Sequence, residues 1–247
     1  MTRYFTNNFS VTSLHKNPSI KSEIVTQMIY GESFSIIKKN KNWIKIRIKE
    51  DNYKGFVKNK KFSSFIKPTH KVCKLKTKVY NFYDKKKFTG ELSFNSKIKV
   101  LSEKYGYLKF DKGWVNKRDV KRLSYKDKDI FKNIKIFRNI RYKWGGKSFK
   151  GIDCSGLIQV FLNFNNRFCP RDAKDQLSYF KGNIDLKKIK KNDIIYWKGH
   201  VAVALSSKQL IHAYGPMKKT VIMNIKNTLK RIKDTANLNL KKIKRIK

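Results

Sequence analysis

Short alternating stretches, each followed by a Gly-aromatic-Val triplet, occur twice in the first half of the chain. Apolar and basic residues alternate from Trp43 to Ile48, and Gly55-Phe56-Val57 follows. A second alternating stretch, from Tyr107 to Phe110, precedes Gly113-Trp114-Val115. Alternation with a period of two predicts half-buried strands. The repetition therefore predicts two small all-β barrels in tandem.

The pattern changes near residue 125. Apolar spacing predicts helices over residues 129–138 and 155–164, and two strands over residues 200–205 and 209–214. The tail from Asn227 is basic, with apolar residues spaced at Leu240, Ile243 and Ile246, which favours a short amphipathic helix or a frayed end. We expect an α+β protein with four segments: barrels over 1–67 and 68–124, a mixed domain over 125–235, and a basic tail over 236–247.

The charge is large but evenly distributed. Among 247 residues, Lys and Arg number 60 and Asp and Glu 17, a net charge of +43. The basic residues are interleaved with Ile, Asn and Phe along the whole chain, and no zinc-finger, helix-turn-helix or RNA-binding signature accompanies them. We interpret the charge as a solvated surface without specific nucleic-acid recognition. Weak, salt-sensitive attraction to anionic polymers should follow.

Several classes of protein are not indicated. No apolar run approaches the roughly 18 residues that a membrane-spanning helix needs, and the first twenty residues lack the apolar core of a secretory signal. We therefore expect no transmembrane segment and a cytoplasmic location. The three cysteines, Cys73, Cys154 and Cys169, are odd in number and widely spaced, so no disulfide scaffold is predicted. No metal-ligand spacing occurs, and no metal or cofactor is predicted.

Cys154 stands at the predicted start of a helix. Asp153 is a good N-cap, and apolar residues with helical spacing follow at Leu157 and Ile158. The helix dipole and the free backbone N–H groups of a first turn favour a thiolate there. The competing interpretation is a buried structural cysteine, which is the usual role of a free cysteine.

Two of the four histidines fall on the two strands predicted after the helix. The separation between His200 and His212 is even, and a turn lies near residues 206–207, so both can project from one sheet face at roughly opposite positions. Ala202 and Ala204 share that face, and small side chains let a helix approach closely. A cysteine at a helix start that meets a histidine, with a second polar group behind it, is a papain-like arrangement. The alternative is a pair of hydrogen-bonded core histidines.

At this point the sequence resembles a known family, the NlpC-type cell-wall cysteine peptidases, over residues 140–232. The matching blocks are Tyr142-Lys143-Trp144-Gly145-Gly146, Gly151-Ile152-Asp153-Cys154-Ser155-Gly156, Cys169-Pro170-Arg171-Asp172, Asp193-Ile194-Ile195-Tyr196-Trp197, Gly199-His200-Val201-Ala202-Val203 and Ile211-His212-Ala213. The two barrels resemble bacterial SH3-like domains, which such peptidases often carry. One departure is Asn192, where the family usually has glycine.

The resemblance implies a papain-like fold and hydrolysis of murein peptides between γ-D-glutamate and a diamino acid. It makes Cys154 the nucleophile, His200 the general base and then acid, and His212 the residue that orients His200. Backbone N–H groups at the helix start would hold the oxyanion. The hydroxyl of Tyr142 would reach the same region.

Asp153 presents a physical problem, because a carboxylate beside the nucleophile opposes thiolate formation. Helix capping is one compensating reason for it. The other comes from the resemblance: in relatives that cleave short peptides with a free N-terminal L-alanine, the matching acid and the following serine bind the ammonium group. Asp153 and Ser155 match those positions, and Tyr53 and Glu23 are candidates from the first barrel. This predicts a dipeptidyl-peptidase that recycles wall peptides.

A second hypothesis is a non-catalytic protein that binds peptidoglycan or another anionic polymer and carries a vestigial site. The charge and the two barrels motivate it. It predicts retention on such polymers with a steep dependence on salt.

Overall fold

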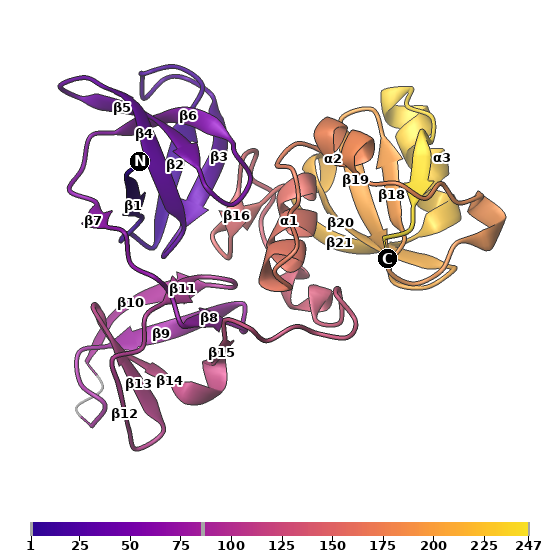
Figure 1. Cartoon of the computed structure of the whole chain (residues 1–247). Helices are drawn as coiled ribbons and strands as arrows, with labels where there is room; N and C mark the ends of the chain where they lie inside the picture. The colour runs from indigo at the N-terminus through magenta and orange to yellow at the C-terminus, as the bar shows by residue number, and fades with distance from the viewer. Residues whose placement is uncertain (1, 85–86, 247) are drawn as a thin grey trace. The chain divides into compact units, whose positions relative to one another are not determined.

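The computed structural model of the chain describes residues 2–84 and 87–246. It divides into two compact units (Figure 1). Unit 1 comprises Met1–Lys126 and Lys147–Phe149, and unit 2 comprises Asp127–Gly146 and Lys150–Lys247. Both predicted barrels thus fall in one unit, and three residues from the middle of the predicted third segment join it. Residue 1 of the first predicted barrel, residues 85 and 86 of the second, and residue 247 of the tail lie outside the described part.

The first barrel of unit 1 is built on an antiparallel sheet with strand order β3-β2-β6-β5-β4-β1-β7. The predicted alternation is confirmed, because Ile44, Ile46 and Ile48 of β5 are buried in the barrel core. The strands are β1 Tyr4–Thr6, β2 Val11–His15, β3 Ile24–Ile29, β4 Ser33–Lys39, β5 Trp43–Ile48, β6 Lys54–Lys58 and β7 Ser63–Ser64.

The second barrel of unit 1 contains two sheets, β10-β9-β14-β13-β12 and β11-β8-β15. Its core includes Tyr30 from the first barrel, which is 4% exposed. Gly31 follows with φ +81°, and a Cβ there would lie 1.9 Å from the Lys97 carbonyl oxygen, so only glycine fits this close approach. The strands are β8 His70–Val72, β9 Lys76–Tyr80, β10 Phe88–Ser93, β11 Lys97–Ile98, β12 Ser102–Lys104, β13 Tyr107–Phe110, β14 Gly113–Asn116 and β15 Val120–Arg122.

Unit 2 has one antiparallel sheet, in the order β21-β20-β19-β18-β22, with α1 and α3 on opposite sides (Figure 1). Ala202 and Ala204 share a core cluster with Ile225 and Ile232 of α3, so the helix admitted by these small residues is α3 and not the cysteine helix α1. The elements are β17 Gly151–Ile152, α1 Cys154–Phe164, α2 Ala173–Tyr179, β18 Ile194–Trp197, β19 His200–Ala204, β20 Gln209–Tyr214, β21 Lys219–Asn224, α3 Ile225–Ala236 and β22 Lys242–Lys244. Strand β16, Lys147–Ser148, belongs to unit 1.

The α+β class is confirmed, one local expectation was wrong, and a second holds for part of its residues. Over residues 129–138 the structure has turns and a short 3₁₀ helix, Ile134–Phe137, whose preceding Asn133 makes no side-chain cap. The chain then reaches Asn139 with φ +66°, which ends helical geometry. In the tail from Asn227 the expected helix is present as far as Ala236, the last residue of α3. The residues after it are neither helical nor frayed at their end, because β22 pairs with β18 and buries Ile243 to 2% exposure.

Candidate active site

Cys154 begins α1, as the sequence predicts. Asp153 is its N-cap, and the Gly156 N–H donates to Asp153 Oδ1 at 2.7 Å. This cap satisfies one of the backbone donors that a helix start leaves unpaired. Gly156 also keeps this turn tight, because a Cβ there would lie 2.5 Å from the Gly146 carbonyl oxygen.

The Asp153 carboxylate is neutralised by Arg171, a role that the sequence analysis did not assign. Arg171 Nη1 donates to Asp153 Oδ1 at 3.0 Å, and Nη2 donates to Oδ2 at 2.5 Å. Both side chains are buried, and the Gly145 N–H adds a bond to Oδ2 at 2.8 Å. A planar guanidinium matches a carboxylate in this two-pronged way. The Arg171 guanidinium therefore offsets part of the charge that opposes a thiolate at Cys154.

Ser155 takes part in the same network. Its hydroxyl donates to Asp153 Oδ1 at 3.3 Å and accepts from Arg171 Nη1 at 2.9 Å. Its carbonyl accepts from Gln176 Nε2 at 2.9 Å. Asp153 and Ser155 are therefore held by protein groups, and an ammonium ion could reach these oxygens only by joining or displacing those bonds.

The Cys154 thiol is buried at the start of β19. Its pKa is raised to about 12, chiefly by burial and then by the nearby Asp153 carboxylate, while backbone N–H groups of Val201 and Ser155 bond to the sulfur and oppose that rise. Val201 directly follows His200, so the sulfur lies beside the first residues of this strand. The thiol is protonated at neutral pH, contrary to the expectation of a resting thiolate, because desolvation outweighs the helix terminus.

His200 and His212 contact each other directly. Val203 pairs with Ile211 in the ladder between β19 and β20, so the two histidines are diagonal neighbours on one face and not directly opposite. His200 Nε2 lies 2.9 Å from His212 Nδ1. The prediction that the hairpin brings these two side chains together is confirmed.

Aromatic rings surround the pair of histidines, His200 and His212. Trp197 lies 5.6 Å from His200 between ring centroids, and Tyr214 stacks on His212 at 4.7 Å. Burial lowers the pKa of His200 to about 4, and burial together with the charge of His200 lowers the pKa of His212 well below its usual value. Both imidazoles are therefore neutral at pH 7. On its far side, His212 Nε2 lies 3.4 Å from Met223 Sδ.

Tyr142 is placed near the nucleophile by a parallel bridge to Ile152, two residues before Cys154. Burial raises the pKa of its hydroxyl, and the charges of Cys154 and Asp153 raise it further. The phenol therefore stays protonated and available as a donor. Its ring lies against Gly215, where a Cβ would come within 3.6 Å of the ring carbons.

The two remaining predicted site residues belong to unit 1. Glu23 precedes β3 and lies 3.9 Å from the Lys16 ammonium, with 46% of its side chain exposed. Tyr53 precedes β6, and its backbone N–H donates to Asp51 Oδ1 at 2.9 Å. The structure thus assigns these two residues to one unit and the cysteine and histidines to the other.

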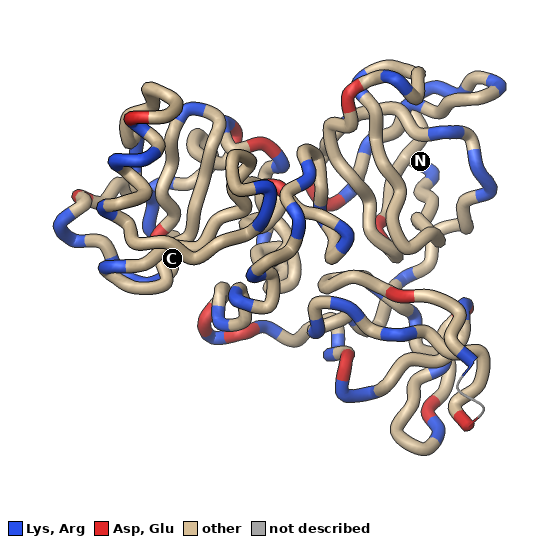
Figure 2. Tube along the Cα trace, turned by 180° about the vertical axis from the view of Figure 1, so that it is seen from behind, with Lys and Arg blue, Asp and Glu red and all other residues tan. Residues whose placement is uncertain are grey.

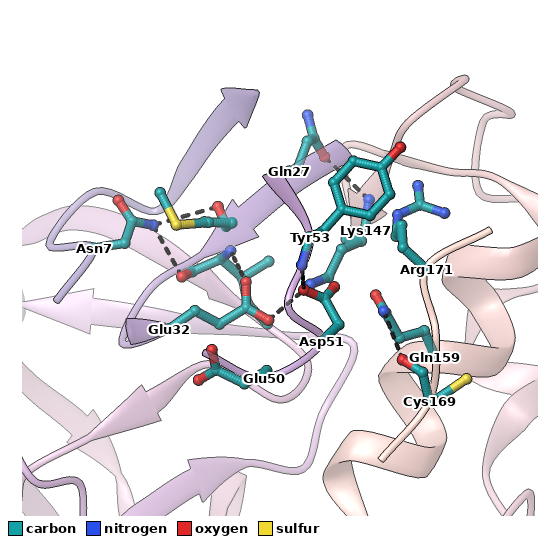
Figure 3. A network of polar contacts seen from close by, with 12 residues as sticks. Asn7, Gln27, Glu32, Glu50, Asp51, Tyr53, Lys147, Gln159, Cys169 and Arg171 are labelled. Carbon is teal, nitrogen blue, oxygen red and sulfur yellow. Dashed lines mark hydrogen bonds and ion pairs between the residues drawn. The ribbon is translucent and has the colours of Figure 1, made fainter. Parts of the chain in front are cut away.

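Unit 1 also contains a buried ion pair that the sequence analysis missed (Figure 3). Lys147 Nζ lies 2.8 Å from Glu32 Oε1, and each side chain is 1% exposed. The Lys147 backbone N–H donates to Gln27 Oε1 at 3.1 Å, and the Ile29 N–H donates to Glu32 Oε2 at 2.9 Å. The two residues are 115 positions apart, so no local pattern could have indicated the pair.

The surface charge is distributed over both units. Figure 2 shows Lys and Arg along every part of the trace, with few Asp and Glu between them. Among the residues described, no helix combines the length and apolarity needed to cross a membrane. Within the same residues, no group of three or more His, Cys, Asp or Glu side chains is arranged to hold a metal ion.

Comparison with known families matches two parts of the chain. The NlpC/P60 family model matches residues 139–235, and the model of the bacterial dipeptidyl-peptidase Sh3 domain matches residues 14–62. These stretches contain the cysteine helix, both histidines and most of the first barrel. The resemblance of the chain to NlpC-type peptidases and to bacterial SH3-like domains is therefore confirmed.

Similar proteins extend over most of the chain. The gamma-D-glutamyl-L-lysine dipeptidyl-peptidase of Bacillus subtilis is 25% identical over 230 residues, which cover 83% of this chain and 77% of that protein. Dipeptidyl-peptidase 6 of Lysinibacillus sphaericus is 23% identical over 233 residues, covering 82% and 84%. The crystal structure of an NlpC/P60 family protein from Bacillus cereus has a TM-score of 0.83 at 20% identity, over 98% of this chain and 99% of that one, and shows the same fold.

Proposed function

We propose that this chain, an NlpC/P60 protein with a bacterial dipeptidyl-peptidase SH3 domain before its catalytic unit, is a cysteine peptidase of cell-wall peptides. The bond cleaved is the one between γ-D-glutamate and a diamino acid. The observation that carries the proposal is the sulfur of Cys154 beside the first residues of β19, where His200 is hydrogen-bonded to His212.

The reaction starts from a neutral thiol and a neutral imidazole. His200 takes the proton of Cys154 as the sulfur attacks the γ-glutamyl carbonyl carbon, and the carbonyl oxygen becomes an oxyanion. Backbone N–H groups at the start of α1, together with the Tyr142 hydroxyl, stabilise that oxygen. His200 then gives its proton to the leaving amine as the C–N bond breaks, which yields a thioester. Water, deprotonated by His200, hydrolyses the thioester and regenerates the thiol.

Arg171 makes this proton transfer less costly. An uncompensated carboxylate at Asp153 would oppose the developing thiolate, whereas the guanidinium offsets that charge. The raised pKa of Cys154 and the lowered pKa of His200 keep the free enzyme in its neutral form. Nucleophile and base thus become charged only as the reaction proceeds.

The substrate is a short peptide with a free N-terminal L-alanine, from which the enzyme releases a dipeptide. The names of the Bacillus subtilis and Lysinibacillus sphaericus relatives support dipeptidyl-peptidase action. Asp153 and Ser155 are the proposed ligands of the ammonium group, and Tyr142 contacts the reacting end. Such peptides arise during wall recycling, so we place the enzyme in the cytoplasm.

The alternative, a binding protein with a vestigial site, is not favoured. Its two motivating features, the charge and the barrels, occur equally well in an enzyme, and the histidine pair keeps a hydrogen bond that binding would not need. A binding protein would be retained on peptidoglycan at low salt, less so as the salt concentration rises, and would release no product.

Three substrates compared side by side test the proposal: L-Ala-γ-D-Glu-L-Lys, the same tripeptide acetylated at its N-terminus, and intact wall. We expect L-Ala-γ-D-Glu to be released from the free tripeptide, with much less from the other two. Absence of product from all three would reject the peptidase. Equal cleavage of free and acetylated tripeptide would reject the ammonium-binding residues while leaving the peptidase intact.

A further inference from the structure

The proton positions on the histidine pair follow from what lies at its far end. His212 Nε2 is 3.4 Å from the sulfur of Met223, which lies on β21. A thioether sulfur carries no hydrogen and can only accept. The contact is attractive only when His212 Nε2 carries the proton.

We propose that Met223 is a positioning residue that fixes the tautomers of both histidines through its thioether sulfur. Only the kinetic consequence of this inference rests on the proposed function of the site. The geometry that carries it is a continuous line of contacts, from Met223 Sδ to His212 Nε2 and from His212 Nδ1 to His200 Nε2 at 2.9 Å.

Each step of the line determines the next. A neutral imidazole has one N–H, so a proton on His212 Nε2 leaves His212 Nδ1 as an acceptor. His200 Nε2 must then donate to it, which leaves His200 Nδ1 without a proton. The unprotonated nitrogen carries the lone pair that a base needs to take the thiol proton of Cys154.

The register explains why Met223 reaches this position. In the ladder between β20 and β21, Met223 pairs with Leu210, whereas Val221 pairs with His212. Met223 is therefore the diagonal neighbour of His212 on the same face, and its long, flexible side chain spans the offset. It also packs on the core cluster of this face, which restricts the sulfur.

A sulfur acceptor has a consequence that a carboxylate would not have. It orients His212 without adding negative charge, so His212 stays weakly basic. When His200 becomes an imidazolium during catalysis, its proton is not drawn away to His212. The proton therefore remains available for the leaving amine.

Long-range ¹H–¹⁵N spectra of the histidine side chains in the full chain test the tautomers without any substrate. His200→Gln and His212→Gln variants assign the signals. We expect both histidines in the wild-type protein to be Nε2–H tautomers at pH 7. A His212 signal from the Nδ1–H tautomer would overturn the proposal, whatever the protein hydrolyses.

Met223→Leu removes the acceptor and keeps the bulk. We expect His212 to become a mixture of tautomers and kcat on the tripeptide to fall about two- to tenfold with KM unchanged, the size of one modest hydrogen bond. Met28→Leu, the same change in the core of unit 1, should alter neither. An unchanged histidine spectrum in Met223→Leu would overturn the proposal.

Met223→Glu distinguishes the effect of a hydrogen-bond acceptor at this position from the effect of a negative charge. A carboxylate also accepts from Nε2–H, but it should hold His212 protonated at neutral pH and shift the acid limb of the kcat profile. If Met223→Glu instead matches the wild-type spectrum and pH profile, the side chain at position 223 does not act on His212 and the proposal fails.

Discussion

Each unit contains an ion pair whose two side chains are buried, and these two pairs are built differently. In unit 1 a single Lys147 ammonium meets one oxygen of Glu32 at 2.8 Å. In unit 2 the Arg171 guanidinium meets both oxygens of Asp153 and also donates to Ser155 Oγ at 2.9 Å. The pKa of Glu32 is raised, chiefly by burial, although the charge of Lys147 opposes that rise.

The difference shows what each pair does. A buried ion pair stabilises only where its hydrogen bonds replace the lost water. The pair of unit 1 joins the segment Lys147–Phe149 to the first barrel. The desolvation of its two charges offsets part of the stabilisation that the pair provides. The pair of unit 2 satisfies a carboxylate that stands beside the nucleophile, and so serves the chemistry as well as the fold.

Removing Arg171 should have the largest effect on stability. Arg171→Leu leaves the Asp153 carboxylate buried and unpaired, and we expect the free energy of unfolding to fall by about 3–5 kcal/mol, with loss of tripeptide hydrolysis. Arg171→Lys keeps the charge without the two-pronged geometry and should lie between that variant and the wild type. Urea denaturation followed by circular dichroism measures this. Equal stability of Arg171→Leu and wild type would show that the ion pair between Arg171 and Asp153 does not stabilise the fold.

Acid should affect the two units in opposite directions. The pKa of His200 is lowered from 6.5 to about 4, so the unfolded chain binds the proton first, and unit 2 should lose about 3 kcal/mol as the pH falls from 6.5 to 4. The pKa of Glu32 is raised above 4.5, so its protonation on acidification should stabilise unit 1.

Hydrogen exchange resolved by segment, corrected for intrinsic rates, measures both responses across this pH range. His200→Gln should flatten the acid loss in unit 2, and Glu32→Gln should flatten the gain in unit 1. Acid responses of the same sign in both units would contradict the pKa directions on which the comparison depends.

Breaking the pair of unit 1 should cost less than breaking that of unit 2. Glu32→Gln leaves the Lys147 ammonium with an uncharged partner, and we expect a loss of about 1–3 kcal/mol. Adding Lys147→Met should recover most of it, because a buried pair can often be replaced by apolar groups at little cost. The denaturation series of single and double variants checks this. A double variant less stable than Glu32→Gln would mean that Lys147 stabilises the unit by other contacts.

The exposed pair between Glu23 and Lys16 should matter least to stability. Their charged atoms are 3.9 Å apart and largely exposed, and Glu23→Gln should change the free energy of unfolding by less than about 0.5 kcal/mol. A stability loss comparable to that of Glu32→Gln would remove the distinction between exposed and buried pairs.

Local patterns accounted for the elements that carry the site. The alternation of Trp43–Ile48, the Asp153 cap and the hairpin that joins His200 to His212 each depend on residues close in sequence. The tail was misjudged because the spacing of Leu240 and Ile243 fits a helix as well as a strand, and only the free edge of β18 decides between them.

Partners distant in sequence explain the rest. Lys147 and Glu32 are 115 positions apart, and each alone looks like one more surface charge among 77 charged residues, the 60 basic and 17 acidic ones. Arg171 lay in a recognised block, but its partner Asp153 had been assigned to the substrate. The resting thiolate was wrongly expected because the desolvation of Cys154 depends on tertiary packing.

The central claim is that the sulfur of Cys154 is the nucleophile, and the three cysteines of the chain allow a matched test. Release of L-Ala-γ-D-Glu from the free tripeptide should fall at least about a thousandfold in Cys154→Ala. Cys73→Ala and Cys169→Ala should retain activity close to that of the wild type. Substantial release of the dipeptide by Cys154→Ala would contradict the account.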